Sequence, residues 1–415
     1  MKKPIRAFTI NSLLLYIWVI LLVVDCFSLY YKIYGYKLTQ LANIGISVVM
    51  LVVLLFKNGR IGRYDFIFLC YLIVSFTYLI VVCNYQYMGF ITGCAIPVIL
   101  YYLYFSLGVN ARRVADALFC FENIILVIAA VSLLFYIFGT LLHVISPSAY
   151  YSSTRIGWAD FDYASYYGVY FEGQRTFFFG RTLVRNIGFF VEAPIFAYVL
   201  ASALYIELFF RDKLRKSAFC ILTLTIITTF STTALSISVI LVFVYYYNNH
   251  MNKSFLKLFV PIVLIIVMYV ASKIVLDKVS VGNDSGSVRT DDVIACLKAF
   301  ADNPLTGIGY NNMRGIDPYR GGFRQNGLAG MSSGIPFVFA SGGIVHGLIY
   351  VLPALIAIKR MIIARGKIPW KLYGFIFVQT ALMTITVVEF TLLGMFFLAL
   401  MWAMILHQKQ LETIA

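Results

Sequence analysis

Long apolar runs separated by short polar segments dominate the chain, and this pattern is typical of membrane-spanning helices. A helix needs roughly 20 mostly apolar residues to cross the hydrocarbon core of a bilayer, and the runs approach that length. The pattern predicts an all-α polytopic integral membrane protein with about twelve transmembrane helices in a single membrane domain, residues 1–415. The predicted spans are residues 12–27, 41–56, 64–83, 90–107, 119–142, 187–210, 218–230, 234–247, 258–271, 335–358, 373–388 and 390–406.

Polar residues divide the two longest apolar stretches. Residues 218–247 are too long for one span, and the Ser-Thr-Thr trio at residues 231–233 offers a place to turn. Residues 373–406 pose the same problem, with Glu389 near their middle. Because an acidic side chain is costly in hydrocarbon, we expect Glu389 at a membrane surface or in a polar cavity.

Basic residues fall mainly between alternate spans, and short loops of this kind are retained on the cytoplasmic side. The basic segments are residues 1–6, 57–63, 112–113, 211–216, 253–257, 359–371 and 409. The short loops on the other side carry only Lys32 and Lys37. This contrast predicts that both termini are cytoplasmic, with the basic start of the chain leading into a retained first helix.

Two large loops, residues 143–186 and 277–334, are predicted on the outer side. Their basic residues are mostly arginines, and the first loop has no lysine. Because arginine binds oxyanions in a planar, bidentate way, we expect these loops to bind an anionic substrate. The alternative is that the arginines face water or lipid headgroups, since long loops cross the membrane whatever their charge. The candidate substrate-binding arginines are Arg175, Arg181, Arg314, Arg320 and Arg324.

Composition excludes a water-soluble fold. Apolar residues make up 61% of the chain and charged residues only 12%, whereas a soluble domain carries about 25% charged residues. The mean hydropathy is +0.87. The net charge of +15 does not indicate nucleic-acid binding, because the basic residues form no single domain or stripe. All cysteines except Cys296 lie in apolar runs, and the sequence contains no zinc, Walker or dinucleotide motif, so no metal or cofactor is expected.

An ionisable pair enters the sixth predicted span in the sequence Arg185-Asn-Ile-Gly188-Phe-Phe-Val-Glu192-Ala-Pro194. On a helix, Arg185 and Glu192 would share a face, and Gly188 would let another helix or a ligand approach closely. Pro194 is tolerated near a helix start. The pair could simply anchor the helix end, but an acid inside a membrane is costly and usually functional, which favours a functional Glu192.

The second outer loop predicts a short amphipathic helix that rests on the outer membrane surface or on the bundle. Thr290 and Asp291 are N-cap candidates, and Arg289 lies at the leading end of this helix. The first-turn amides and Arg289 together are expected to form an anion site. The predicted apolar stripe consists of Val293, Leu297 and Phe300.

A Gly-rich turn follows this helix. Asn303 and Pro304 stop the helix, and the turn behind them contains the candidate substrate-binding residues Tyr310 and Asn311. Two other features are interpreted as structural. The hydroxyls at residues 231–233 satisfy backbone groups at a helix end in preference to contacting a substrate, and His346 packs between helices in preference to acting in catalysis.

Together these motifs resemble those of the O-antigen ligase and polymerase superfamily, most closely the Wzy-type polymerases of capsular and exopolysaccharide clusters. The shared order is Arg-x-x-Gly-x-Phe-x-Glu-x-Pro at residues 185–194, a Ser-Thr-Thr break at residues 231–233, and Asn-Pro-Leu-x-Gly-Ile-Gly-Tyr-x-Asn at residues 303–312. The resemblance covers roughly residues 185–358 and the overall order of spans.

The resemblance implies metal-independent glycosyl transfer between undecaprenyl-pyrophosphate-linked substrates on the outer face of the plasma (inner) membrane. Arg185 and Arg289 match the family's arginines in its two large loops, and we expect them to stabilise the pyrophosphate leaving group. Glu192 is the best-placed general base for the attacking sugar hydroxyl. The implied partners are the undecaprenyl-pyrophosphate-linked oligosaccharide, membrane lipid, a chain-length regulator and a flippase.

One departure favours a polymerase over a ligase. The ligase branch carries a histidine before a Gly-rich span, and here the corresponding residues 326–334 read Asn-Gly-Leu-Ala-Gly-Met-Ser-Ser-Gly. His346 lies beyond the position that the family pattern gives. The alternatives are ligase-type transfer to a different acceptor, and a flippase or transporter of the lipid-linked unit, although the sequence shows no internal repeat typical of transporters. A structural scaffold would not need arginines at the membrane entry.

Overall fold

The structure is a computed structural model that describes residues 10–35, 37–56, 60–83, 85, 87–152, 161–178, 181–249, 285–324, 330–363 and 369–412. The predicted span at residues 258–271 lies outside this part of the chain. Every other predicted span overlaps a helix.

Helices make up most of the described chain. The α-helices are α1 (Ile10–Asp25), α2 (Leu29–Tyr34), α3 (Lys37–Phe56), α4 (Arg63–Val81), α5 (Tyr87–Phe90), α6 (Ile96–Ser106), α7 (Ala111–Phe135), α9 (Ala193–Phe209), α10 (Lys216–Thr228), α11 (Thr232–Asn249), α13 (Ser285–Asp302), α14 (Gly334–Ile363), α15 (Trp370–Ile385), α16 (Leu392–Leu406) and α17 (Gln408–Leu411). Short π-helical segments η1 (Ile91–Ala95) and η2 (Tyr136–Leu141) adjoin α6 and α7, and the 3-10 helices η3 (Met313–Tyr319) and η4 (Gly322–Arg324) follow α13.

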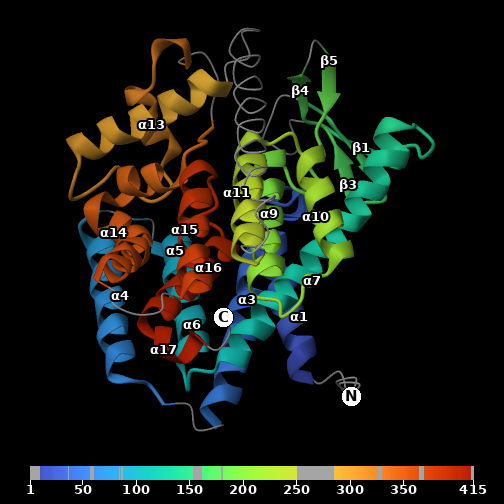
Figure 1. The fold of residues 1–415 in the computed structure, drawn as a ribbon. Helices are drawn as coiled ribbons and strands as arrows, with labels where there is room; N and C mark the ends of the chain where they lie inside the picture. The colour runs from blue at the N-terminus through green and yellow to red at the C-terminus, as the bar shows by residue number, and fades with distance from the viewer. Residues whose placement is uncertain are drawn as a thin grey trace, which may run out of the picture.

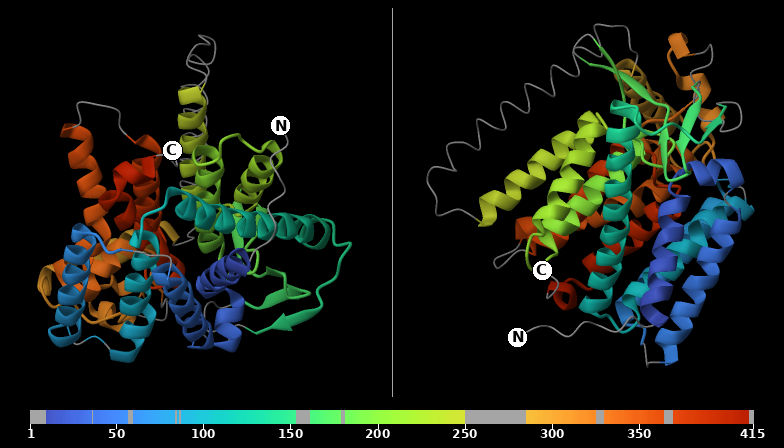
Figure 2. Two further views of the ribbon diagram at one scale, coloured as in Figure 1. Left: turned by 90° about the horizontal axis from the view of Figure 1, so that it is seen from below. Right: turned by 90° about the vertical axis from the view of Figure 1, so that its right-hand side faces the viewer.

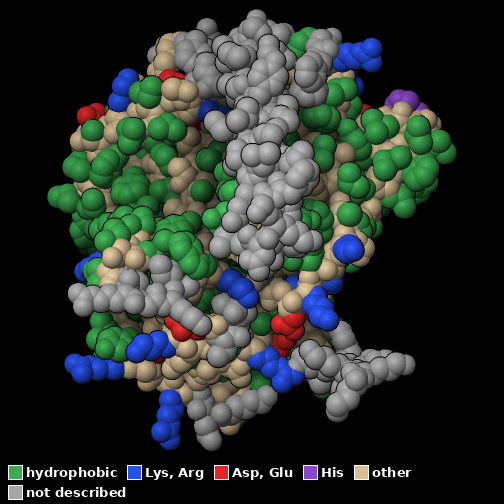
Figure 3. Space-filling view, in the orientation of Figure 1, with side chains coloured by type: hydrophobic (Ala, Val, Ile, Leu, Met, Phe, Trp, Pro, Cys, Tyr) green, Lys and Arg blue, Asp and Glu red, His purple; other side chains and the backbone are tan. Residues whose placement is uncertain are grey.

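Several of these helices have the length and composition of membrane spans. Five segments qualify, namely Lys37–Phe56, Arg63–Val81, Met88–Ser106, Ala111–Leu141 and Gly334–Ile363. Shorter apolar helices are α1, α9, α10, α11 and α16. Apolar side chains cover the visible sides of the bundle, and most visible Lys and Arg side chains gather toward its lower end (Figure 3). The chain is therefore a multi-pass membrane protein, while the count of about twelve spans stays a prediction.

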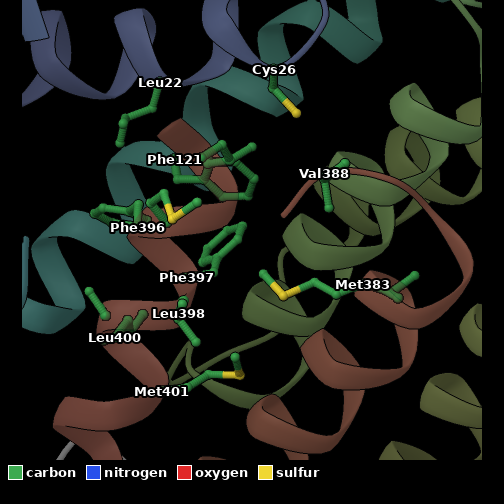
Figure 4. Packing of buried hydrophobic residues seen from close by; sticks show 14 of the residues in the cluster. Leu22, Cys26, Phe121, Met383, Val388, Phe396, Phe397, Leu398, Leu400 and Met401 are labelled. Carbon is green, nitrogen blue, oxygen red and sulfur yellow. The ribbon is translucent and has the colours of Figure 1, made fainter. Parts of the chain in front are cut away.

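The core of the bundle is built around α16. This helix is apolar on all sides and almost completely buried, as expected for a helix that other helices surround. Phe397 packs edge-on against Phe121 of α7, with 5.2 Å between the ring centres (Figure 4). On the adjacent side, Phe396 packs against Trp18 of α1 at 5.4 Å. Spans that are distant in the sequence are thereby joined.

The first outer loop contains short strands, which the all-α prediction missed. An antiparallel sheet has the order β1 (Ala149–Tyr151), β2 (Tyr163–Tyr166) and β3 (Tyr170–Glu172), and β4 (Arg175–Phe178) pairs with β5 (Arg181–Val184) as a hairpin. Aromatic residues favour strands, and this loop is rich in tyrosine and phenylalanine. The short strands give no long alternating pattern, which is why the sequence did not reveal them.

A break in α14 receives the Gly-rich turn that follows α13. The break lies at residues 342–343, where the backbone leaves helical geometry. The amides of Ile308 and Gly309 each donate to carbonyls on the first half of α14 at 2.9 Å, and the amide of Ile344 on the second half donates to the carbonyl of Pro304 at 2.8 Å. The turn thus satisfies polar groups that the break frees, and it fixes α13 to the bundle.

The elements of the two outer loops gather at one end of the molecule. Figure 1 shows α13 and the β4–β5 hairpin at the top, while α17 lies toward the opposite end, and the side view in Figure 2 agrees. The loops that the sequence analysis assigned to one side of the membrane therefore share one end of the bundle.

Candidate functional site

Arg185 leaves β5 and reaches the end of a different helix. Its backbone amide donates to the carbonyl of Gln174 at 2.8 Å, which extends the β4–β5 ladder. Its guanidinium, only 9% exposed with the rest of the residue, donates through Nε to the carbonyl of Thr229 at 2.8 Å. Thr229 lies just past the end of α10, where the helix carbonyls carry partial negative charge, so the contact favours a cation. The turn between α10 and α11 therefore binds the side chain of Arg185.

The helix predicted through Arg185 and Glu192 is wrong. α9 begins at Ala193, and Gly188 has a φ of 59°, in the left-handed region that favours glycine. The side-chain oxygen of Asn186 accepts a hydrogen bond from the Gly188 amide at 3.0 Å. The apolar residues in between resemble a helix start in the sequence, but the asparagine and the glycine form a turn.

The backbone at Glu192 is held by two neighbouring elements. The amide of Val191 donates to the carbonyl of Phe27 at 3.0 Å, at the corner between α1 and α2. The hydroxyl of Tyr163 on β2 donates to the carbonyl of Val191, also at 3.0 Å. Glu192 is the residue immediately before α9, and Pro194 occupies the first turn, as the sequence predicted for this proline.

Arg289 approaches the same region from α13. The prediction that Arg289 begins this helix is wrong, because α13 starts at Ser285 and Arg289 lies one turn inside it. Thr290 and Asp291 consequently lie within the helix and do not cap it. The first-turn amides of α13 therefore do not adjoin Arg289 in the way that the expected anion site required. The end of the helix at Asp302 agrees with the predicted stop at residues 303–304.

Arg185, Glu192 and Arg289 interact electrostatically. Burial lowers the pKa of Arg185 to about 10, an effect that Glu192 opposes and Arg289 reinforces. Burial also lowers the pKa of Arg289, whereas the charges of Glu192 and Asp292 raise it. Both arginines are thus close enough to Glu192, and to each other, for their charges to act on one another. These three residues, from two outer loops and a helix start, are called the Arg–Glu–Arg cluster below.

The cluster suits anion binding. Two guanidinium groups against one carboxylate leave a net positive charge, and the start of α9 adds partial positive charge beside Glu192. In partly desolvated surroundings such charges attract an anion more strongly than they would in water. Within the described ranges, no three His, Cys, Asp or Glu side chains gather as a metal site would require.

The face that α13 buries differs from the predicted stripe. Leu297 is 55% exposed, whereas Phe300 does pack against Phe339 of α14, with 5.4 Å between ring centres. The residues that α13 buries against the bundle are Asp292, Ala295, Cys296 and Ala299. Small side chains let two helices approach closely, so the contact uses alanine and cysteine where the pattern suggested large apolar residues.

Arg324 holds the rest of the second outer loop on α13, and Arg320 binds residues of the loop beyond that helix. Arg324 forms an ion pair with the buried carboxylate of Asp292, and Arg320 pairs with Asp317 at 2.8 Å. Both arginines also donate to the carbonyl of Gly330. Their side chains are buried among these partners, which gives them a role in the structure of the loop. A substrate contact for either one stays a prediction.

The other candidate arginines are exposed. Arg175 begins β4 next to Gln174, Arg181 begins β5, and Arg314 lies on η3. The β4–β5 hairpin, which carries Arg175 and Arg181, lies at the same end of the molecule as α13 (Figure 1). Their contacts with a substrate remain predictions.

Tyr310 and Asn311 differ in their surroundings. Tyr310 packs edge-on against Phe390, with ring centres 5.2 Å apart, and also contacts Tyr85 at 5.3 Å. Asn311 is exposed and has a φ of 48°, which asparagine tolerates better than most residues. Tyr310 therefore ties the turn to the bundle, and Asn311 shapes it.

Sequence reasoning missed the residues that support the cluster. Gln174, Asn186 and Thr229 hold Arg185 and the backbone before Glu192, yet each looks like an ordinary polar loop residue in the sequence. Glu389 was noticed, and it does lie in the turn between α15 and α16, but it is completely buried. His346 is buried as well, with Nδ1 2.8 Å from the hydroxyl of Tyr85, which agrees with its interpretation as a packing residue.

Comparison with known proteins supports the resemblance. No curated protein matches the chain significantly. Residues 217–352 match the family described as O-antigen ligase. The match begins in α10 and ends in α14, so it includes Arg289 but not Arg185 or Glu192. The chain thus carries an O-antigen ligase family domain, consistent with the O-antigen ligase/polymerase superfamily.

Proposed function

We propose that the protein is a polysaccharide polymerase, a membrane glycosyltransferase that joins undecaprenyl-pyrophosphate-linked repeat units on the outer face of the plasma membrane. The observation that carries this proposal is the Arg–Glu–Arg cluster, in which the charge of one glutamate acts on two arginines from different outer loops. The O-antigen ligase family domain supports transfer of a lipid-linked glycan. No step of the proposed reaction is assigned to a metal or a cofactor.

In the proposed reaction, a hydroxyl oxygen of the acceptor sugar bonds to the anomeric carbon of the donor glycan. The bond from that carbon to the pyrophosphate oxygen breaks, and undecaprenyl pyrophosphate leaves with the bonding electrons. Arg185 and Arg289 stabilise the negative charge that develops on the leaving group. Glu192 accepts the proton from the attacking hydroxyl. One glycosidic bond forms for each sugar–phosphate bond that breaks.

A polymerase fits the chain better than a ligase. Where the ligase pattern has a histidine before a Gly-rich span, residues 326–334 contain none. His346, the nearest later histidine, is buried and its Nδ1 faces the hydroxyl of Tyr85. With Glu192 as the base, the reaction does not need a histidine at that position.

Reconstitution with a single defined substrate tests the proposal. The full chain is inserted into lipid vesicles with a lipid-linked repeat unit, and products are separated by chain length while released undecaprenyl pyrophosphate is quantified. A polymerase gives a ladder of longer lipid-linked glycans and one released carrier per bond formed. A ladder that appears only after a different acceptor is added indicates a ligase, and movement of the unit across the bilayer without bond formation indicates a flippase. Either result overturns the proposed polymerase.

A further inference from the structure

The first amide of α9 is capped from outside the helix. Glu192 is the N-cap residue, but its side chain makes no capping hydrogen bond. The amide of Ala193 donates instead to the side-chain oxygen of Gln174 at 2.9 Å. A glutamine in the first outer loop thus satisfies the first amide of α9, whereas an N-cap side chain would bond the second or third amide of the helix.

Gln174 also contacts Arg185. Its carbonyl accepts the amide of Arg185 at 2.8 Å, one step beyond the Arg175–Val184 pair of the hairpin. In an antiparallel ladder, residues directly opposite each other project to the same face. Gln174 therefore lies beside Arg185 through the ladder and beside Glu192 through Ala193.

Capping from Gln174 has a consequence for Glu192. A carboxylate at a helix start is drawn to the unpaired amides of its own first turn. Pro194 removes one of those amides, and Gln174 satisfies another. Gln174 therefore fixes the backbone that carries Glu192 relative to the strand end that carries Arg185, and the charge of Glu192 acts on both arginines.

We propose that Gln174 is a positioning residue, which binds the amides of both Arg185 and Ala193 and so holds Glu192 in place relative to Arg185. This inference rests on the proposed function, because it assigns Glu192 a task in the reaction. Gln174 itself touches no reacting atom. It acts by joining the β4–β5 ladder to the start of α9.

Two replacements of similar length separate the capping oxygen from the volume of the side chain. Gln174→Met keeps the length and removes the acceptor, whereas Gln174→Glu keeps both the length and an acceptor oxygen. In the reconstituted full chain, we expect Gln174→Met to lower kcat about tenfold or more with KM changed less than about twofold, since a misplaced base slows the chemical step without weakening binding. We expect Gln174→Glu to retain kcat within about threefold of the parent. Equal kcat for Gln174→Met and the parent overturns the inference.

A double variant tests whether Gln174 acts through Glu192. On the background of Glu192→Gln, the change Gln174→Met should lower the residual rate no further, because the carboxylate that it misplaces is already gone. Additive losses would show that Gln174 stabilises the loop independently, and would overturn the inference. If Glu192→Gln alone keeps the full rate, the proposed function of Glu192 fails first. If Glu192→Gln lowers kcat but Gln174→Met does not, only the role proposed for Gln174 is overturned.

Discussion

Burial lowers the pKa of Arg185 and the charge of Arg289 lowers it further, so the two guanidinium groups act on each other although they come from different outer loops. Two like charges that are partly removed from water are costly unless an anion or a carboxylate compensates them. Glu192 supplies one negative charge, and a pyrophosphate would supply the rest. The cluster therefore keeps a net positive charge, which would favour an added anion.

The first prediction follows from this pair. Arg185→Ala and Arg289→Ala should each lower the polymerisation rate about 100-fold or more, the usual cost of removing a donor that stabilises a developing oxyanion. The chain-length distribution of lipid-linked glycan, measured at matched levels of inserted protein, checks this. Lys298→Ala is the matched control, because Lys298 is an exposed cation on the same helix as Arg289. Long polymer from either arginine variant would remove that arginine from the site.

The second prediction separates the base from the anion site. Glu192→Gln keeps the size of the side chain but removes its charge, so we expect kcat to fall about 100-fold or more. Binding of the lipid pyrophosphate should not weaken, because the loss of a negative charge raises the net positive charge of the cluster. Glu412→Gln, at an exposed position far along the chain, is the control. Weaker pyrophosphate binding in Glu192→Gln would contradict the assignment of Glu192 as the base.

Sequence alone predicted much of the membrane fold, because apolar periodicity directly reflects the length of a span. The runs at residues 64–83 and 335–358 correspond closely to α4 and α14. The break within α14 was not predicted, since Gly342 and Gly343 interrupt a run that remains apolar on both sides. Its partner is a turn on another segment, so no local pattern could reveal the break.

The candidate site was predicted by residue type and not by geometry. Arg185, Glu192 and Arg289 stood out because charges near a membrane are costly, and the structure does bring their charges together. The helix expected between Arg185 and Glu192 is absent, because the left-handed Gly188 and its bond to Asn186 depend on the backbone. The helical spacing rule that linked Arg185 to Glu192 therefore does not apply, and their role in a site stays a prediction.

The third prediction concerns the turn that docks into α14. Gly307 has a φ of 61°, and a Cβ at this position would collide with the carbonyl of Ser341. Gly307→Ala should therefore displace the turn, and with it α13 and Arg289, and abolish polymer formation. Gly322→Ala is the matched control, because nothing lies within 4 Å of a Cβ at that position. Protease sensitivity of the second outer loop and chain-length analysis together check this. Normal polymer from Gly307→Ala would show that the turn does not position Arg289.

The fourth prediction concerns the buried ion pair between Asp292 and Arg324. The Asp292 carboxylate also accepts hydrogen bonds from the amide and hydroxyl of Ser332, at 2.8 and 2.6 Å, so removal of Arg324 leaves a buried charge without its main counter-ion. Arg324→Met should lower the free energy of unfolding by about 3–5 kcal/mol, as breaking one side of a buried pair does. Asp302→Asn, at an exposed position on α13, should change it by less than about 0.5 kcal/mol.

A double variant identifies the origin of that loss. Arg324→Met combined with Asp292→Leu replaces both charges by apolar groups and should recover much of the stability, because no buried charge is then left unpaired. Thermal unfolding in detergent gives the stability of each variant, and limited proteolysis measures how well the loop is protected. If Arg324 instead binds substrate and has little part in folding, Arg324→Met will unfold like the parent and lose only substrate affinity. That result would restore Arg324 to the substrate-binding residues and leave Asp292 without a structural task.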